Sequence, residues 1–252
     1  MKINVILAPA ELPALAQRDL RNTLCVVFDV LRATSTFVTA LHYGAKGIIP
    51  VGEISEALAI KKKQPDVLLG GERDGVRIRA AQTGGTDFDL GNSPRECTPE
   101  KVRGKTIVST TTNGTRALRA CAKAQAVLAS SFLNLSATAE YIQKLRPMEV
   151  LLICAGTRED KADEDVLGAG ALCELLARGD ARPTFADSAE VALRAWAQAK
   201  SDLTGAVSNA TNARRLLAIP ELRDDVAFCL QRDVFPLVAR MGVDGAIRRQ
   251  LA

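Results

Sequence analysis

The residues most able to do chemistry follow apolar runs that are typical of buried strands. Residues 24–30 are apolar apart from Asp29, and Arg32 lies three positions after that carboxylate. This carboxylate would lie at the carboxyl-terminal edge of a sheet, and the planar guanidinium of Arg32 could bind a phosphate or a sulfonate. A structural Asp–Arg pair is the alternative. An aspartyl nucleophile of the haloacid-dehalogenase type needs a second aspartate two positions later, and Leu31 stands there, which weakens that mechanism.

A second polar segment, Thr110-Thr111-Thr112-Asn113-Gly114-Thr115, ends a β-branched run that begins at residue 106. Gly114 permits a tight turn, after which the first amides of a helix would point outward without partners. Hydroxyls of Thr111, Thr112 and Thr115 could join those amides around an anion. An ordinary helix cap is the alternative, but three threonines before Asn-Gly exceed what a cap needs. The segment therefore predicts anion binding.

Two acidic groups complete the candidate chemistry. Glu72 and Arg73 follow Gly70-Gly71 at a strand end, and Asp163, Glu164 and Asp165 precede a helix. Acidic residues are common in a first helical turn because of the helix dipole alone. If several of these carboxylates converge, they would make a hard-oxygen site suited to Mg²⁺ rather than zinc.

Two apparent motifs lack features that their usual functions require. Cys97 and Arg103 have the spacing of a cysteine phosphatase loop, but there is no glycine between them and no strand before them. Gly168-Ala169-Gly170 resembles the start of a dinucleotide fingerprint, yet it lies inside a helical pattern without an adjoining strand. We expect neither to be functional.

The amino-acid composition argues against several classes of function. The single histidine, His42, leaves little support for a Ser–His pair, a zinc site built on two imidazoles or a phosphohistidine. An aromatic share of 4% is too low for base-stacking platforms, and a net charge of +4 suits a small anionic substrate rather than nucleic acid. Six cysteines without paired spacing predict buried free thiols. The N-terminal apolar run is too short for a signal peptide or membrane span, so we expect a cytoplasmic protein.

The elements that must position these residues alternate between strands and helices. Strands are expected near residues 1–7, 24–30, 47–51, 66–69, 106–111, 126–130 and 149–154, with helices at 34–43, 55–63, 115–123, 134–145 and 164–178. This order predicts an α/β fold with a mostly parallel or mixed sheet, and ligands beyond the carboxyl ends of its strands. Residues 74–104 form a long polar segment typical of functional loops, and 186–252 are expected to be mainly helical.

Domain organisation is left open by the same pattern. The chain forms either one domain over 1–252 or two packed halves, about 1–104 and 105–252. Similar strand–polar tip–helix units at 24–43, 106–123 and 149–178 hint at an internal duplication, although no fixed period supports it. The sequence is also compatible with a homo-oligomer.

An ordered set of strings resembles the 2-phosphosulfolactate phosphatase family. The strings are Val27-Phe28-Asp29-Val30-Leu31-Arg32-Ala33-Thr34-Ser35-Thr36, Gly71-Glu72-Arg73, Leu90-Gly91-Asn92-Ser93-Pro94, Thr111-Thr112-Asn113-Gly114-Thr115, Cys154-Ala155-Gly156, Glu164-Asp165 and the segment from Asp225 to Asp233. They follow the family's order from about residue 3 to residue 240.

The resemblance implies a three-layer α/β/α enzyme that uses Mg²⁺ to hydrolyse 2-phospho-3-sulfolactate to 3-sulfolactate and phosphate, on a route to sulfolactate or coenzyme M. Together with the residue patterns it gives Asp29 and Glu72 catalytic roles and places Asp29, Glu72, Glu164 and Asp165 around the metal. The substrate-binding candidates are Arg32, Thr34, Ser35, Arg73, Asn92, Ser93, Thr111, Thr112, Asn113, Gly114, Thr115 and Gly156.

Two alternatives stay open. One is a phosphatase of the same family that acts on another small 2-phospho acid. The other is a non-catalytic protein that binds organic phosphates or sulfonates. The binding protein ranks last, because so many carboxylates at strand ends would repel anions unless a metal offset them.

Overall fold

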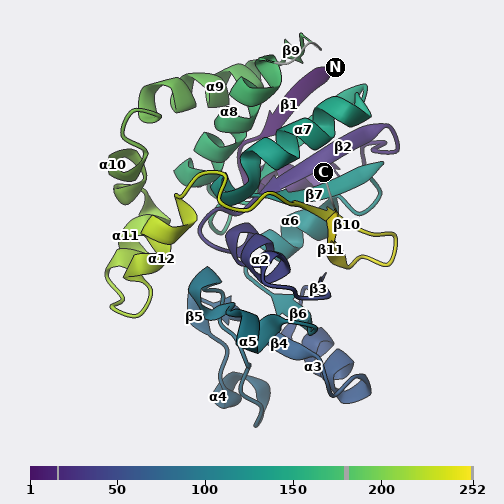
Figure 1. Ribbon diagram of the computed structural model, residues 1–252, viewed down its shortest axis with the longest axis vertical. Helices are drawn as coiled ribbons and strands as arrows, with labels where there is room; N and C mark the ends of the chain where they lie inside the picture. Colours follow the sequence, from purple (N-terminus) through teal and green to yellow (C-terminus); the bar gives the residue numbers. More distant parts are fainter. Residues whose placement is uncertain (16, 179–181, 251–252) are drawn as a thin grey trace.

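The computed structural model describes residues 1–15, 17–178 and 182–250, and its centre is one mixed sheet (Figure 1). The strand order is β5-β4-β6-β3-β11-β10-β7-β2-β8-β1-β9. The strands are β1 (Lys2–Ile6), β2 (Thr23–Phe28), β3 (Gly47–Pro50), β4 (Leu68–Arg73), β5 (Val76–Arg77), β6 (Thr106–Thr110), β7 (Ala126–Ser130), β8 (Glu149–Cys154), β9 (Thr184–Phe185), β10 (Val238–Met241) and β11 (Ile247–Gln250). The prediction of a mostly parallel or mixed sheet is confirmed.

Two parallel blocks make up this sheet. Strands β7, β2, β8, β1 and β9 are parallel to one another, and so are β4, β6 and β3. The C-terminal hairpin β10–β11 lies between the blocks and pairs antiparallel with β7 on one side and β3 on the other. Three successive antiparallel pairings therefore separate the blocks, and their strands run in opposite directions.

The hairpin corrects one expectation. Residues 186–252 were expected to be mainly helical, and this holds only as far as Cys229, since 238–241 and 247–250 are strands. Their turn contains Gly242 and Gly245, the latter with φ of 78°. Glycine at a positive φ is a turn signal that a helical reading of this segment overlooks.

Helices cover both faces of the sheet. They are α1 (Leu12–Leu15), α2 (Ala33–His42), α3 (Ile54–Lys63), α4 (Ala80–Thr83), α5 (Pro99–Val102), α6 (Gly114–Ala120), α7 (Leu135–Leu145), α8 (Asp163–Ala177), α9 (Asp187–Ala199), α10 (Leu203–Ser208), α11 (Thr211–Leu217) and α12 (Arg223–Cys229). Short 3₁₀ turns lie at Pro9–Glu11, Pro94–Glu96 and Phe132–Asn134. The elements form the three α/β/α layers that the family resemblance implied.

The core follows from alternation along the central strands. In β2, Leu24, Val26 and Phe28 pack into one apolar cluster with α7, α8 and α9, whereas Cys25 and Val27 join a second cluster with α2 and α6. A smaller third cluster lies under α3. Every residue of β2 is buried, as expected for a strand covered on both faces.

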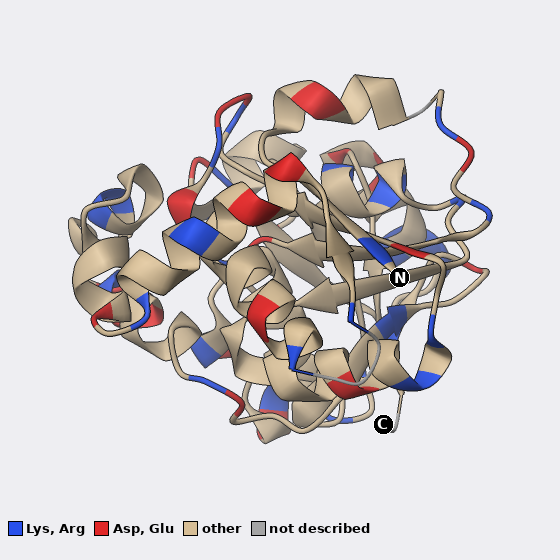
Figure 2. Ribbon diagram, turned by 90° about the horizontal axis from the view of Figure 1, so that it is seen from above, with Lys and Arg blue, Asp and Glu red and all other residues tan. Residues whose placement is uncertain are grey.

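The prediction about the cysteines can be compared with this structure. All six cysteines are free and buried, as their spacing predicted. Basic and acidic residues are interspersed over the ribbon in Figure 2. Within residues 1–15, 17–178 and 182–250, no helix combines the length and apolar character needed to cross a bilayer.

Candidate active site

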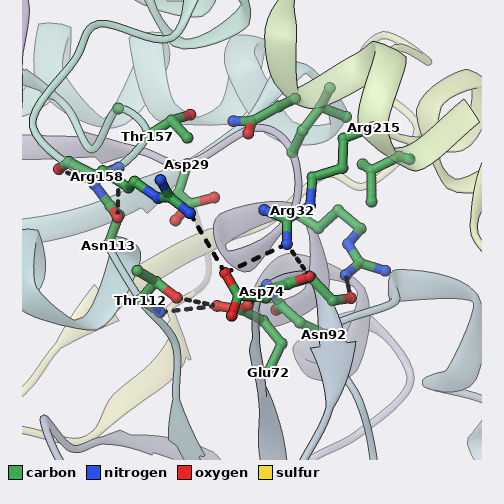
Figure 3. Close-up of a pocket in the computed structure, with 15 residues that line it drawn as sticks. Asp29, Arg32, Glu72, Asp74, Asn92, Thr112, Asn113, Thr157, Arg158 and Arg215 are labelled. Atoms are coloured by element: carbon green, nitrogen blue, oxygen red, sulfur yellow. Dashed lines mark hydrogen bonds and ion pairs between the residues drawn. The ribbon is translucent and has the colours of Figure 1, made fainter. Parts of the chain in front are cut away.

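A polar pocket is lined by six segments of the chain, with residues that follow strands of both parallel blocks (Figure 3). Residues at or after the carboxyl ends of β2, β4, β6 and β8 contribute most of the lining, and α11 covers one side. The lining residues are Asp29, Leu31, Arg32, Glu72, Asp74, Gly75, Asn92, Thr112, Asn113, Gly156, Thr157, Arg158, Asn212, Arg215 and Leu216. The pocket thus lies at the strand ends, where the sequence placed the ligand.

Asp29 is the most perturbed carboxylate of the pocket. It is 9% exposed, and its Oδ1 accepts a hydrogen bond of 3.0 Å from the Ala33 amide at the start of α2. Burial, followed by the charges of Glu72 and Glu164, raises the pKa of Asp29 to about 7. The other oxygen, Oδ2, lies so close to Gly114 that a Cβ there would be 2.5 Å away. Position 114 must therefore be glycine for the carboxylate to approach α6.

Glu72 is held from two sides. Its Oε1 accepts from the backbone nitrogen of Thr112 at 2.8 Å and from the Thr112 hydroxyl at 3.0 Å. Its Oε2 accepts from the Gly75 amide at 2.7 Å. Three bonds fix Glu72 in the pocket, whereas one bond to a side-chain oxygen holds Asp29.

Arg73 lies outside the pocket, contrary to its expected role beside Glu72. The expected strand ended at residue 69, but β4 continues to Arg73, so successive side chains point to opposite faces. The Arg73 guanidinium instead donates to the Glu72 carbonyl at 2.7 Å and the Thr110 hydroxyl at 3.0 Å. The pocket-lining set does not include it.

Arg32 does line the pocket, and its ion pair is with a distant residue. The guanidinium is 2% exposed and donates to Asp225 Oδ2 at 2.8 Å and to the Gly75 carbonyl at 2.5 Å. Asp225 also accepts from the Ser93 hydroxyl at 2.7 Å. The structural pair considered for Arg32 and Asp29 therefore forms with Asp225 from α12 instead.

The threonine-rich segment divides between the pocket and the interior. Thr115 donates its hydroxyl to the Thr111 carbonyl at 3.0 Å, and Thr111 Oγ1 accepts from the Thr115 amide at 3.2 Å. Thr112 and Asn113 line the pocket. Asn113 Nδ2 donates to the Ala155 carbonyl at 2.7 Å, which ties this segment to the β8–α8 loop.

Several other predicted residues support the pocket from behind. Thr34 and Ser35 are fully buried, and their hydroxyls donate to the carbonyls of Asp29 and Val30. Ser93, Thr111, Gly114 and Thr115 are likewise absent from the lining, whereas Asn92 and Gly156 belong to it.

Glu164 and Asp165 stand behind the pocket rather than in its wall. Asp165 accepts from the amides of Val30 at 2.8 Å and Gly156 at 2.9 Å. Glu164 Oε1 accepts from Asn212 at 2.9 Å, while its buried Oε2 has no hydrogen-bond partner within residues 1–15, 17–178 and 182–250. Burial raises the pKa of both acids. Among the residues that the structure describes, no three or more His, Cys, Asp or Glu side chains form a group that could hold a metal ion.

Sequence reasoning missed one side of the pocket, formed by Asp74, Gly75, Arg158, Asn212 and Arg215. Asp74 and Gly75 make the two-residue turn between β4 and β5, with φ of 55° and 77°. An Asp-Gly pair between strands is a strong hairpin signal, so this turn could have been found. The other three lie on the β8–α8 loop and α11, and no local pattern marks them.

The two dismissed motifs have structural explanations. Cys97 is buried, and burial raises the pKa of its thiol to about 12, which argues against a reactive thiolate. Gly168 and Gly170 both lie within α8, where a Cβ would meet the Phe28 ring and the Ala192 carbonyl respectively. These glycines permit close packing of α8 against the sheet and α9.

A buried carboxylate with a raised pKa, Asp29, lies beside arginines in a pocket at strand ends, which is typical of an α/β enzyme with a site for small anions. Residues 10–242 match the family model described as 2-phosphosulpholactate phosphatase. The chain accordingly belongs to the 2-phosphosulfolactate phosphatase family, as the resemblance indicated, and the enzyme class of that family is phosphoric monoester hydrolase.

Relatives that align with nearly the whole chain have the same description. The chain is 40% identical over 236 residues to a probable 2-phosphosulfolactate phosphatase of Thermotoga petrophila, which covers 94% of this chain and 93% of the relative. The Thermotoga maritima protein of the same description is 39% identical with the same coverage. A Picosynechococcus protein so described is 34% identical over 253 residues, covering 98% of this chain and 100% of the relative.

Proposed function

We propose that this protein hydrolyses 2-phospho-3-sulfolactate to 3-sulfolactate and inorganic phosphate, with Mg²⁺ as its cofactor. The observation that carries the proposal is the Asp29 carboxylate, which is buried in the pocket with a pKa of about 7 and has arginines nearby. The names of the relatives supply the substrate class.

The donor set of the pocket fits Mg²⁺ in its usual mode of binding. Mg²⁺ is commonly held by one or two carboxylates, with waters and substrate phosphate oxygens completing its coordination. Asp29 and Glu72 are hard oxygen donors that line one pocket, and the mutual repulsion of their charges contributes to the raised pKa of Asp29. Behind them lies the buried Oε2 of Glu164, an oxygen without a hydrogen-bond partner among the described residues. When bound there, Mg²⁺ would neutralise charge on the phosphoryl group.

Asp29 and Glu72 have different roles because they differ in how far their carboxylate oxygens are engaged in hydrogen bonds. Glu72 accepts hydrogen bonds at both oxygens, from Thr112 and Gly75, so its orientation is fixed and only the remaining lone pair of Oε2 would be free for Mg²⁺. Asp29 has an oxygen that is not engaged by Ala33, and a pKa of about 7 lets it exchange a proton at neutral pH. We therefore assign Asp29 as the reacting carboxylate, acting on the attacking water or on phosphorus directly. In either case the bond from phosphorus to the C2 oxygen breaks. The water oxygen ends on phosphate, and a proton from that water ends on the C2 oxygen to give 3-sulfolactate.

The test is release of phosphate from 2-phospho-3-sulfolactate by the purified protein, with Mg²⁺ or with EDTA. We expect turnover that requires Mg²⁺ and exceeds that of p-nitrophenyl phosphate. Preferential hydrolysis of 2-phospholactate would reassign the substrate to another 2-phospho acid. Ligand-induced stabilisation without any phosphate release would instead identify a binding protein and contradict the proposal.

A further inference from the structure

With Arg73 directed away from the pocket, other groups must bind the substrate's second and third anionic groups. Arg32 is a poor candidate for the sulfonate, because Asp225 already neutralises its buried charge at 2.8 Å and Gly75 accepts from its other terminal nitrogen. The remaining arginines of the pocket wall, in the part of the chain that the structure describes, are Arg158 and Arg215. They come from the β8–α8 loop and from α11.

Both of these guanidinium groups face one exposed carboxylate. Arg215 Nη2 is 3.5 Å from Asp74 Oδ1, and Arg158 Nη2 is 3.8 Å from the same oxygen. Figure 3 shows Asp74 in the middle of the pocket, with Arg158 and Arg215 reaching it from different elements. Two positive charges thus share one negative charge, and exposed ion pairs at such distances contribute little to stability.

The backbone around this group is anchored, and so is the side chain of Arg215. Asn113 bonds both the amide and the carbonyl of Arg158, at 3.2 and 3.0 Å. Arg215 also donates to the Asp74 carbonyl, and Glu72 holds the turn through the Gly75 amide. The backbone of Arg158 and the guanidinium of Arg215 are therefore held without the Asp74 carboxylate, whose side chain is 76% exposed and can rotate away.

We infer that Arg158 and Arg215 form a clamp for the substrate's sulfonate, and that Asp74 occupies this clamp until substrate displaces it. The inference rests on the proposed function, because it names the groups that distinguish a sulfonated substrate. A sulfonate is permanently ionised and offers three oxygens, which two guanidinium groups can bind together. The carboxylates of Asp29 and Glu72 remain on the phosphoryl side of the pocket.

The kinetic test compares 2-phospho-3-sulfolactate with 2-phospholactate, which lacks only the sulfonate. In R158Q and R215Q, the ratio of the two kcat/KM values should fall about tenfold, mainly through the KM of the sulfonated substrate. The matched control is R214Q, since Arg214 is exposed on the same helix and lies outside the pocket lining. This control should keep the wild-type ratio. An equal loss on both substrates in R158Q and R215Q would overturn the clamp.

Calorimetry with the products tests the clamp without turnover. Wild-type protein should bind 3-sulfolactate about tenfold more tightly than lactate, and R215Q should lose most of that difference. D74N removes the competing charge, while asparagine still tolerates the positive φ of the turn, so it should tighten 3-sulfolactate binding severalfold. D160N, which changes another exposed aspartate, should not. Unchanged or weaker binding in D74N would contradict the displacement of Asp74.

These outcomes separate the clamp from the proposed reaction. Arginine-dependent binding of 3-sulfolactate without hydrolysis of either phosphate ester would keep the clamp and reject the phosphatase. Hydrolysis whose selectivity is unaffected in both R158Q and R215Q would keep the phosphatase and reject the clamp.

Discussion

The β2–α2 and β6–α6 connections look alike in sequence but use their polar groups differently. Each follows a buried parallel strand and begins a helix, and each contains residues able to bind an anion. In β6–α6, the hydroxyls of Thr111 and Thr115 bond to each other's backbone and face the interior. In β2–α2, Asp29 lines the pocket and keeps an oxygen beyond its bond to Ala33. Polar composition therefore does not define a site; free hydrogen-bonding capacity toward a cavity does.

The D29N substitution should produce the largest effect, because it removes the reacting carboxylate while keeping its size and its acceptor for the Ala33 amide. We expect kcat to fall by about 1,000-fold, within the range for loss of a positioned acid–base group. D66N is the control, since Asp66 is exposed and lies outside the pocket lining. Near-normal turnover in folded D29N would remove Asp29 from the chemistry and end its contrast with the threonine segment.

The same substitution should stabilise the metal-free protein at high pH. The folded-state pKa of Asp29 is about 7 against an ordinary value of 3.8, so the folded state holds this proton more tightly. Stability contributed by the protonated form is present below about pH 4 and is lost as pH rises through 7. In EDTA, the unfolding free energy of D29N should therefore rise relative to that of wild type between pH 4 and 8, by about 4 kcal/mol at most. Urea unfolding at several pH values measures this difference, and a gap that does not vary with pH would contradict the perturbed pKa.

T115V should give the smallest effect, and it should act on stability rather than catalysis. Valine keeps the shape of Thr115 but leaves the Thr111 carbonyl without its 3.0 Å bond, which should cost about 1–2 kcal/mol of unfolding free energy. Because neither residue lines the pocket, kcat/KM should stay within about threefold of wild type. A large loss of activity in a stable T115V protein would show that this segment binds substrate directly, and the contrast with β2–α2 would fail.

Much of the fold could be predicted because its signals are local. The fully buried β2, the β-branched β6 and the apolar β8 were each placed within one or two residues. The β10–β11 hairpin was missed because its strands pair with β7 and β3, which lie far away in the sequence. The ends of β2, β6 and β8 were easy to locate, whereas the end of β4 was placed too early, which put Arg73 on the wrong face. The pocket lining includes these residues singled out from the sequence: Asp29, Arg32, Glu72, Asn92, Thr112, Asn113 and Gly156.

Tertiary structure alone decided which of these groups remain without an ion-pair or hydrogen-bond partner. The sequence determined that carboxylates, hydroxyls and arginines would gather at the ends of parallel strands, because hydrophobic periodicity is a property of neighbouring residues. It did not determine that Arg32 would pair with Asp225, or that Arg158 and Arg215 would meet at Asp74. Those contacts join segments that are distant along the chain, so the free oxygens and charges of the pocket depend on the packing of the whole molecule.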